Sequence, residues 1–288
     1  MEKENIMNEP RVYKNSPFLF GLLFLMFAIL LSAFFFAAGD SDPSNLMVMI
    51  PFALLFVFLF IFLVVRATAQ TIISEDEIST KTLLGTKSLR WSEINRVSGR
   101  GYAIKLHNFD GDVTVAPATQ LPGYDEVVNW IGMKRPDLFS PLEYAEMKKG
   151  WAGTIIFSLA GLLLLAGLGL FVLTQAGDVL IPLLVFVVFG LIAVVSVFTT
   201  PQSVTIQGDT IVIDYLFNQK TFSAKEISSI DLRYTQTRNG RNYFVAVTLL
   251  NRKAIHISGF TLSLPVICLV LRNWHKKSTS VSQAFQRN

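Results

Sequence analysis

Four long apolar runs divide this chain, and every one of its 25 Lys and Arg residues lies on the same side of them. Each run is at least 20 residues long and contains no Asp, Glu, Lys, Arg or His. At about 1.5 Å of rise per residue, a helix of that length spans the roughly 30 Å hydrocarbon core of a bilayer. The sequence therefore predicts four transmembrane helices, at Phe18–Ala38, Leu46–Val65, Ala152–Leu173 and Val179–Phe198.

The short loops inside each pair of runs carry acidic charge and no basic charge. Gly39–Asn45 contains Asp40 and Asp42, and Thr174–Asp178 contains Asp178. Because Lys and Arg are retained on the cytoplasmic face, both loops should lie outside and both termini inside. Residues that suit the membrane interface also precede the third run, where we expect anchoring by Lys148, Lys149 and Trp151.

The chain also repeats itself. The second pair of runs follows the first at an offset in numbering of 133 to 134, and the polar segments keep the offset of 133, which matches Ile78 with Ile211 and Ile94 with Ile227. This predicts two copies of one unit, a helical hairpin followed by a cytoplasmic domain of about 75 residues. The offset rises to 143 by Leu106 and Leu249, so the extra length of the second copy should lie in the Tyr234–Arg241 hairpin.

Both polar segments have the pattern of strands closed by a helix. Apolar residues alternate from Ile211 to Phe217, as in a half-buried strand, and the Asn239-Gly240 pair is a strong hairpin signal. Near the end of each segment, apolar residues at i, i+3, i+4 and i+7 predict an amphipathic helix; they are Tyr124, Val127, Val128 and Ile131, then Ile267, Val270, Leu271 and Trp274. Each segment should form a bent antiparallel sheet closed by one helix.

The order of these elements resembles the bacterial pleckstrin-homology-like (PH-like) domain. The resemblance rests on a strand, a basic turn and a Glu-Ile step, found at Trp91–Ile94 and Ser223–Ile227, followed by hairpins and a closing helix. It covers about half of the chain. It implies a seven-stranded, partly open barrel with a capping helix and a role in binding or assembly near a membrane. It implies no catalytic residues, and a fold alone does not determine function.

Few residues of the chain point to catalysis. His107, His256 and His275 lack metal-ligand partners at helical spacing, and the single Cys268 permits no internal disulfide. We therefore predict no catalytic, metal-binding or cofactor-binding residue. In the third run, small residues favour close packing inside the bundle or against a second copy in a homo-oligomer, with a lipid-facing surface as the alternative; they are Thr154, Ser158 and Gly161.

Charge separates the two polar segments. Residues 200–288 contain eleven Lys and Arg against four acidic residues, whereas residues 66–150 contain eleven of each. Basic residues at two turns of the second segment could contact anionic lipid or a protein partner, or could be solvated turns that obey the same charge bias; they are Arg233, Arg238, Arg241, Arg252 and Lys253. We expect no nucleic acid, because no helix or aromatic ladder organises these bases.

These patterns predict a bacterial inner-membrane protein with four transmembrane helices, two cytoplasmic α+β PH-like domains, and both termini in the cytoplasm. The expected function is a non-enzymatic, membrane-anchored scaffold or adaptor that binds a protein and membrane lipids, and the alternative is a transporter or its accessory subunit. The expected boundaries are a flank at 1–16, a hairpin at 17–66, a domain at 67–150, a hairpin at 151–199, a domain at 200–277 and a polar tail at 278–288.

Overall fold

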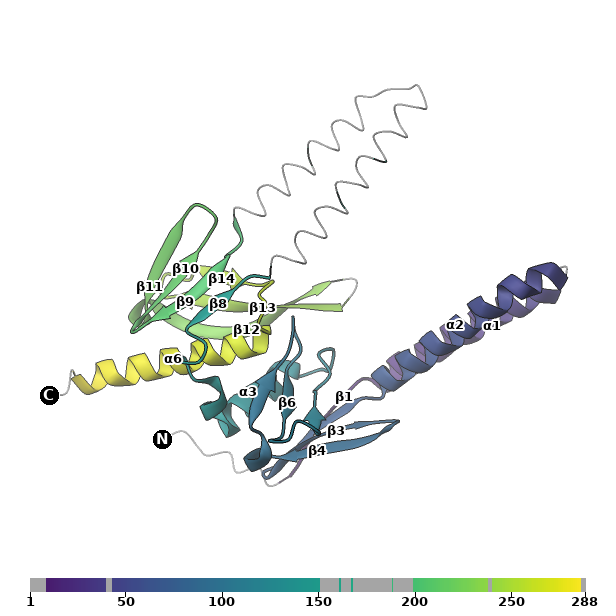
Figure 1. The fold of residues 1–288 in the computed structure, drawn as a ribbon, viewed down its shortest axis with the longest axis horizontal. Helices are drawn as coiled ribbons and strands as arrows, with labels where there is room; N and C mark the ends of the chain where they lie inside the picture. Colours follow the sequence, from purple (N-terminus) through teal and green to yellow (C-terminus); the bar gives the residue numbers. More distant parts are fainter. Residues whose placement is uncertain are drawn as a thin grey trace. The chain divides into compact units, whose positions relative to one another are not determined.

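The computed structural model describes residues 9–39, 43–150, 161, 167, 188, 199–237 and 240–285. The chain divides into two compact units. The first unit comprises Met1–Ser98 and Ala103–Arg135, and the second comprises Gly99–Tyr102 and Pro136–Asn288. Figure 1 shows the fold coloured along the sequence.

The first unit contains a four-stranded and a three-stranded antiparallel sheet. The larger sheet has the order β1 (Arg11–Lys14), β2 (Gln70–Ile73), β3 (Glu77–Thr82) and β4 (Gly85–Arg90). A 3-10 turn, η1 (Trp91–Glu93), leads into the smaller sheet of β5 (Arg96–Ser98), β6 (Lys105–His107) and β7 (Thr114–Val115). Helix α3 (Tyr124–Lys134) follows in the first unit, and the 3-10 turn η2 (Pro136–Phe139) after it belongs to the second unit.

An apolar helical hairpin is inserted between the first two strands of this sheet. Helices α1 (Pro17–Gly39) and α2 (Pro43–Ala67) join β1 to β2, and Lys14 pairs with Gln70 across the two strands. No pattern in the sequence predicts a strand at Arg11–Lys14. The strand forms because Tyr13 points inward and is only 9% exposed, while its hydroxyl donates to Glu126 Oε2 at 3.0 Å. The hairpin is therefore held at both ends by paired strands.

The core of the first unit lies between its sheets and α3. Ile73, Ile78 and Leu89 share one register position on β2, β3 and β4, and none is more than 2% exposed. The predicted stripe of α3 is confirmed, because Tyr124, Val127, Val128 and Ile131 are all fully buried. Two acidic residues in the first turn of α3 and Lys134 in its last turn suit the helix dipole.

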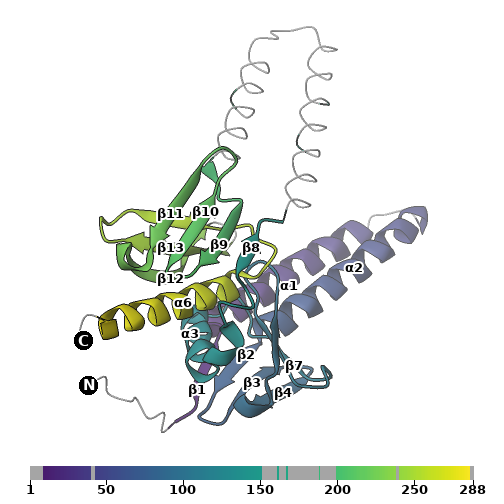
Figure 2. The same ribbon diagram turned by 60° about the vertical axis from the view of Figure 1, so that its left-hand side comes forward.

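The second unit repeats this arrangement. Its larger sheet has the order β11 (Gln219–Ser223), β10 (Thr210–Asp214), β9 (Ser203–Gln207) and β8 (Glu146–Lys148). The turn η3 (Ala224–Glu226) leads into β12 (Ile227–Thr237), β13 (Gly240–Leu249) and β14 (Ala254–Ile257), and helix α6 (Leu264–Phe285) closes the unit. Figure 2 shows α6 running beside β12 and β13, on which it packs.

The offset of 133 that the sequence predicts also describes the paired strands. Ile78 pairs with Leu89 and Ile73, and their counterparts at this offset pair in the same way, Ile211 with Phe222 and Ile206. Ile94 and Ile227 both follow the 3-10 turn. In both turns a glutamate accepts from a backbone N–H three positions earlier: Glu93 Oε2 from Arg90 at 3.2 Å and Glu226 Oε2 from Ser223 at 2.8 Å.

One part of the alignment is wrong. Val97 pairs with Leu106, whereas Ile230, the counterpart of Val97 at the offset of 133, pairs with Val247. The counterpart of Leu106 is therefore Val247, at an offset of 141, and not Leu249. Val247 and Leu249 lie two positions apart on β13 and so share one face of the strand, which is why hydropathy alone does not distinguish the two assignments. The extra length does lie in the β12–β13 hairpin.

The predicted fold class of four transmembrane helices with two domains is wrong. The described residues form four α-helices and fourteen strands in four antiparallel sheets, which is an α+β arrangement. Among them, one helix is long and apolar enough to cross a membrane, through Ile50–Ala67 of α2, and the apolar stretch of α1 is shorter, at Gly21–Phe34. Most of the third and fourth predicted runs lie outside the described residues.

The predicted localisation as a multi-pass inner-membrane protein is wrong for the same reason. Among the described residues, a single helix qualifies as a membrane span, and a multi-pass protein needs more than one. The physical reason is that an apolar run measures only a preference for apolar surroundings. Apolar surroundings can be supplied by a bilayer or by another protein surface, so the length and composition of a run do not by themselves establish a crossing.

Candidate functional site

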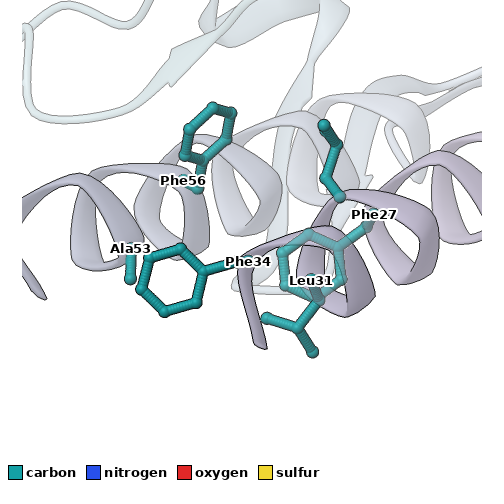
Figure 3. Close-up of a pocket in the computed structure, with 6 residues that line it drawn as sticks. Phe27, Leu31, Phe34, Ala53 and Phe56 are labelled. Atoms are coloured by element: carbon teal, nitrogen blue, oxygen red, sulfur yellow. The ribbon is translucent and has the colours of Figure 1, made fainter. Parts of the chain in front are cut away.

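The hairpin of α1 and α2 has almost no core of its own. The two helices meet through Phe27 and Phe60, whose ring centroids lie 3.9 Å apart, and Figure 3 shows further apolar side chains around a small gap between the helices. Most of the remaining side chains point outward; Phe58, for example, is 67% exposed, and none of Ile50–Ala67 is buried. So large an apolar surface marks a site of contact with lipid or with another protein.

Basic and apolar side chains gather where this hairpin joins the sheet. Lys14, Gln70 and Lys81 occupy one register position on β1, β2 and β3, and Arg66 lies in the last turn of α2. At the same end of the sheet, the β3–β4 turn exposes Leu83 and Leu84 by 62% and 83%. This end of the first unit therefore combines cations with exposed leucines, the composition that suits a membrane interface.

A pocket lined mainly by threonines opens at that end, between the β3–β4 hairpin and β7. Its volume is about 400 Å³. Four of its lining residues are threonines and one is a lysine; the lining comprises Thr80, Thr82, Leu84, Gly85, Thr86, Lys87, Thr114 and Ala116. Thr80 and Lys87 face each other across β3 and β4, two positions along each strand from the buried Ile78–Leu89 pair. The inner face of the sheet thus changes from apolar to polar within one step of the pleat.

Two hydroxyls on this face are buried without a hydrogen-bond partner. They are the Oγ1 atoms of Thr80 and of Thr71, which is fully buried and pairs with Thr80 from β2. A buried polar group left unpaired costs about 1–3 kcal/mol. The neighbouring hydroxyl of Thr82 is satisfied, because it donates to the carbonyl oxygen of Gly85 at 3.2 Å.

The same positions in the second unit are apolar. At the offset of 133, Thr71, Thr80 and Thr82 correspond to Val204, Ile213 and Tyr215, and the first two are fully buried. Lys87 corresponds to Lys220, whose Nζ lies 5.0 Å from the ring centroid of Tyr215. Burial raises the pKa of Tyr215. The sheet therefore forms with apolar side chains where the first unit has threonines.

A serine–histidine pair lies beside the pocket. The Oγ of Ser98 is 2.7 Å from His107 Nε2, and the Oγ1 of Thr114 is 3.0 Å from Nδ1. Burial and the nearby Arg96 and Lys105 lower the pKa of His107. A base that activates a serine is usually oriented by a carboxylate, whereas this one contacts a hydroxyl, and a lowered pKa weakens it as a base. The geometry fits a cross-strand polar bridge.

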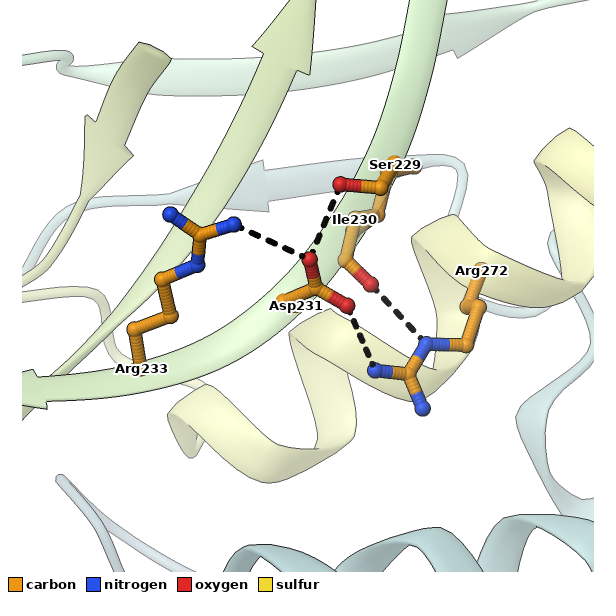
Figure 4. A network of polar contacts seen from close by, with 5 residues as sticks. All are labelled: Ser229, Ile230, Asp231, Arg233 and Arg272. Atoms are coloured by element: carbon orange, nitrogen blue, oxygen red, sulfur yellow. Dashed lines mark hydrogen bonds and ion pairs between the residues drawn. The ribbon is translucent and has the colours of Figure 1, made fainter.

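The five predicted basic residues do not form one cluster. Arg233 pairs with Asp231 at 3.4 Å, and Asp231 also accepts from Arg272 and Ser229, so its charge is shared within the network of Figure 4. Arg241 lies over the ring of Tyr234, with Cζ 4.7 Å from the centroid. Arg238 lies outside the described residues.

The other two basic residues, Arg252 and Lys253, are exposed at the turn that follows β13, whereas Arg241 lies at its start. Ten residues of strand correspond to roughly 30 Å along its path. One anionic headgroup therefore cannot bridge these two ends.

The predicted membrane anchors are divided as well. Lys148 pairs with Glu146 at 2.9 Å, and Lys149 donates to the hydroxyl of Thr200 at 3.2 Å, while burial lowers the pKa of Lys149. Trp151, Thr154 and Ser158 lie outside the described residues, and Gly161 is helical and exposed. Within the described part of the chain, no group of three His, Cys, Asp or Glu residues is placed to hold a metal ion.

Sequence reasoning missed the threonine pocket, although a signal was present. Thr71 and Thr80 stand where the second copy has Val204 and Ile213, and an exchange of core residues for hydroxyls between repeats marks a changed site. No family model matches the chain, and no curated protein shows significant similarity to it.

Proposed function

We propose that this protein is a non-enzymatic, membrane-associated adaptor whose α1–α2 hairpin enters lipid and whose sheet-and-helix units bind a partner. The observation that carries the proposal is the exposed apolar surface of the hairpin between β1 and β2. Phe24, Leu54 and Phe58 are each at least 60% exposed and lie on both helices. Helices that are apolar on all sides are stable when apolar surroundings cover them.

Lipid suits this surface better than a soluble partner does. A protein partner covers one side of a helical pair, whereas lipid surrounds it. The exposed cations Lys14, Arg66 and Lys81 lie at the base of the hairpin, where each could gain about 1 kcal/mol beside an anionic leaflet. Leu83 and Leu84 extend the apolar contact from the hairpin to the sheet.

The strand pairing makes the hairpin an anchor of defined orientation. Four residue pairs join β1 to β2, from Arg11 with Ile73 to Lys14 with Gln70. Asn15 also donates to the carbonyl oxygen of Ala67 at 3.1 Å, which ties the start of the hairpin to its end. A hairpin held at both ends transmits its orientation to the sheet, so β3, β4 and the pocket stay near the lipid surface.

The binding surfaces of such an adaptor are its sheet edges and closing helices. Strand β4 is an edge of its sheet and exposes most of its residues, and edge strands offer unpaired backbone groups to a partner. The resemblance of the sequence to PH-like domains agrees with a binding role. Transport is less well supported, because the gap between α1 and α2 is lined by six apolar side chains and transport needs polar groups in the membrane.

Selective labelling of one introduced cysteine tests the proposal. Cys268 is fully buried, and burial raises its pKa to about 11, so a thiol reagent should react with a new exposed cysteine first. The full chain carrying Phe58→Cys, labelled with a fluorophore and reconstituted into vesicles, should be quenched by lipids with brominated tails.

Met133→Cys is the matched control. Met133 is 61% exposed, close to the 67% of Phe58, and lies on α3. Its neighbour Lys134 donates to the carbonyl oxygen of Glu75, at the end of the sheet away from the hairpin. A label at Met133 should escape quenching. Equal quenching at the two positions, or none at Phe58, would contradict membrane association through this hairpin.

A further inference from the structure

The threonine pocket of the first unit has the features of a ligand site. It joins one cation, four threonines and a volume of about 400 Å³, which is within the range of small-molecule pockets. We propose that this pocket binds a phosphate group, carried either by a soluble phosphate compound or by a lipid headgroup. The proposal goes beyond the adaptor function, since a soluble phosphate could bind without any membrane.

Hydrogen-bonding capacity selects the ligand class. The Oγ1 of Thr80 is buried at the pocket and has no partner, and the Oγ1 of Thr71 lies unpartnered at the paired position on β2. Lys87, across from Thr80, adds three N–H donors and a positive charge. A ligand that accepts several hydrogen bonds and carries negative charge matches the hydroxyl of Thr80 and the ammonium group of Lys87, which both line the pocket, whereas Thr71 is not part of the lining. Phosphate, with several acceptor oxygens, matches both in one group.

The charge of the lining agrees with this choice. Lys87 is the one charged residue among the eight that line the pocket, so no carboxylate in the lining repels an anion. The walls also contain Leu84 and Ala116, which leave room for an apolar or neutral body attached to the phosphate. A phosphomonoester fits this mixture better than a metal ion, because threonine and lysine side chains are poor ligands for cations.

The second unit argues against a purely structural origin for the polar lining. Val204 and Ile213 fill the positions of Thr71 and Thr80 and leave no hydroxyl to satisfy. Lys220, the counterpart of Lys87, stacks on Tyr215 instead of facing a threonine. The fold therefore does not need hydroxyls at these positions, and in the first unit the hydroxyl of Thr80 is available to an acceptor that a ligand supplies.

The location of the pocket allows the phosphate group to come from a soluble compound or from a lipid headgroup. Thr82, Gly85 and Thr86 are at the end of the sheet from which the α1–α2 hairpin leaves, since Gln70 pairs with Lys81 and Lys81 with Thr86. If the hairpin enters lipid, headgroup phosphates lie at the same level as the pocket. In the absence of lipid, the pocket remains open to soluble phosphates.

Two measurements on the full chain separate these sources. In micelles of a neutral, phosphate-free detergent, calorimetric titration with inorganic phosphate and with glycerol phosphate tests the soluble ligand. In nanodiscs of phosphatidylcholine with and without phosphatidic acid, phosphorus NMR tests the headgroup through broadening of the phosphatidic acid signal. Binding in micelles identifies a soluble phosphate compound as a ligand, and broadening in nanodiscs alone identifies the lipid; both support the site. Failure of the hairpin to enter lipid would leave the micelle measurement intact.

Variants test whether the signal comes from the pocket. Thr80→Val removes the hydroxyl at nearly constant volume, and Lys87→Met removes the charge at an exposed position; each should weaken binding about tenfold, the effect of losing one hydrogen bond to a charged group. Lys220→Met, the matched change in the second unit, should leave binding unchanged. Circular dichroism checks that each variant is folded.

Three results would overturn the proposal. The first is the absence of any phosphate-dependent signal from the unmodified chain in both measurements. The second is binding by Thr80→Val and Lys87→Met that equals that of the unmodified chain. The third is an equal loss of binding in Lys220→Met and Lys87→Met.

Discussion

In the first unit, the indole that covers the β2–β3 turn belongs to Trp91 of η1. In the second unit, the indole that covers the corresponding β9–β10 turn belongs to Trp274 of the closing helix α6. Trp91 Nε1 donates to the carbonyl oxygen of Ser74 at 3.2 Å, and Trp274 Nε1 donates to that of Gly208 at 2.7 Å. The position of Trp91 holds Ala224 in the second unit. The two units thus place an indole at the same turn from different points in the chain.

The carbonyl oxygens around the 3-10 turn show the same exchange. Arg135 Nη1 donates to the carbonyl oxygens of Trp91 and Ile94. In the second unit the corresponding oxygens, of Ala224 and Ile227, lie 3.2 and 3.1 Å from His275 Nε2. Because carbonyls only accept, Nε2 carries the proton. The fold determines which backbone groups need a partner, while the residue that supplies the partner is free to vary.

In the threonine pocket, by contrast, two buried hydroxyls have no hydrogen-bond partner within the first unit. Both units build the same paired strands, but the first leaves the hydroxyls of Thr71 and Thr80 without a partner where the second has Val204 and Ile213. The indole and carbonyl exchanges preserve packing and hydrogen bonding. The threonines do not, and that difference separates a structural exchange from a candidate binding site.

Removing the second indole should have the largest effect. Trp274 is 3% exposed, and Trp274→Ala should destabilise the second unit by about 3–5 kcal/mol through loss of apolar contacts and a cavity. Urea unfolding followed by hydrogen exchange of β9 and β10 amides measures the loss. The double variant Trp274→Ile with Ala224→Trp copies the first unit and should recover part of it; no recovery would show that the two indole positions are not equivalent.

The donors to the 3-10 turn should have the next largest effect. Arg135→Met leaves the carbonyl oxygens of Trp91 and Ile94 without this donor and should cost about 1–3 kcal/mol in the first unit. His275→Leu should do the same in the second unit, while His275→Gln, which keeps an N–H donor, should cost less. Equal losses for the Leu and Gln variants would assign the effect of His275 to packing.

Exchanging the polar pairs should have opposite effects in the two units. Thr71→Val removes a buried, unpartnered hydroxyl and should stabilise the first unit by about 1 kcal/mol in the absence of ligand. Val204→Thr introduces such a hydroxyl and should destabilise the second unit by about the same amount. Urea midpoints of each unit measure both changes. Destabilisation by Thr71→Val would indicate that the hydroxyl has a partner within the fold.

The smallest expected effect is a pH dependence of stability that arises from His107 and is therefore confined to the first unit. The pKa of His107 is lowered below its ordinary 6.5, so in acid the unfolded chain takes up the proton before the folded chain does. The stability of the first unit should therefore fall as the pH decreases from above 6.5 through the lowered pKa. His107→Thr copies Thr248 of the second unit and should remove this dependence in thermal unfolding; an unchanged profile would exclude His107 as its source.

Local patterns predicted the elements that depend on near neighbours in the chain. The stripe from Tyr124 to Ile131 predicted α3 because a helix repeats about every 3.6 residues, and comparison of the two copies placed Ile78 and Ile211 on matching strands. Strand β1 escaped notice because its four residues pair with Gln70–Ile73 across the whole hairpin. Helix α6 continues to Phe285, through polar residues that showed no apolar stripe.

By itself the sequence determined the apolar runs, the two copies with their offset of 133 and the helices that close them, since these follow from side chains close together in the chain or from comparing the chain with itself. The tertiary structure alone decided that Thr71, Thr80 and Lys87 stand side by side on three strands, and that Arg135 and His275 meet equivalent carbonyls. Hydrogen-bond satisfaction is a property of neighbours in space. A hydroxyl left without a partner becomes visible only when the strands around it are in place.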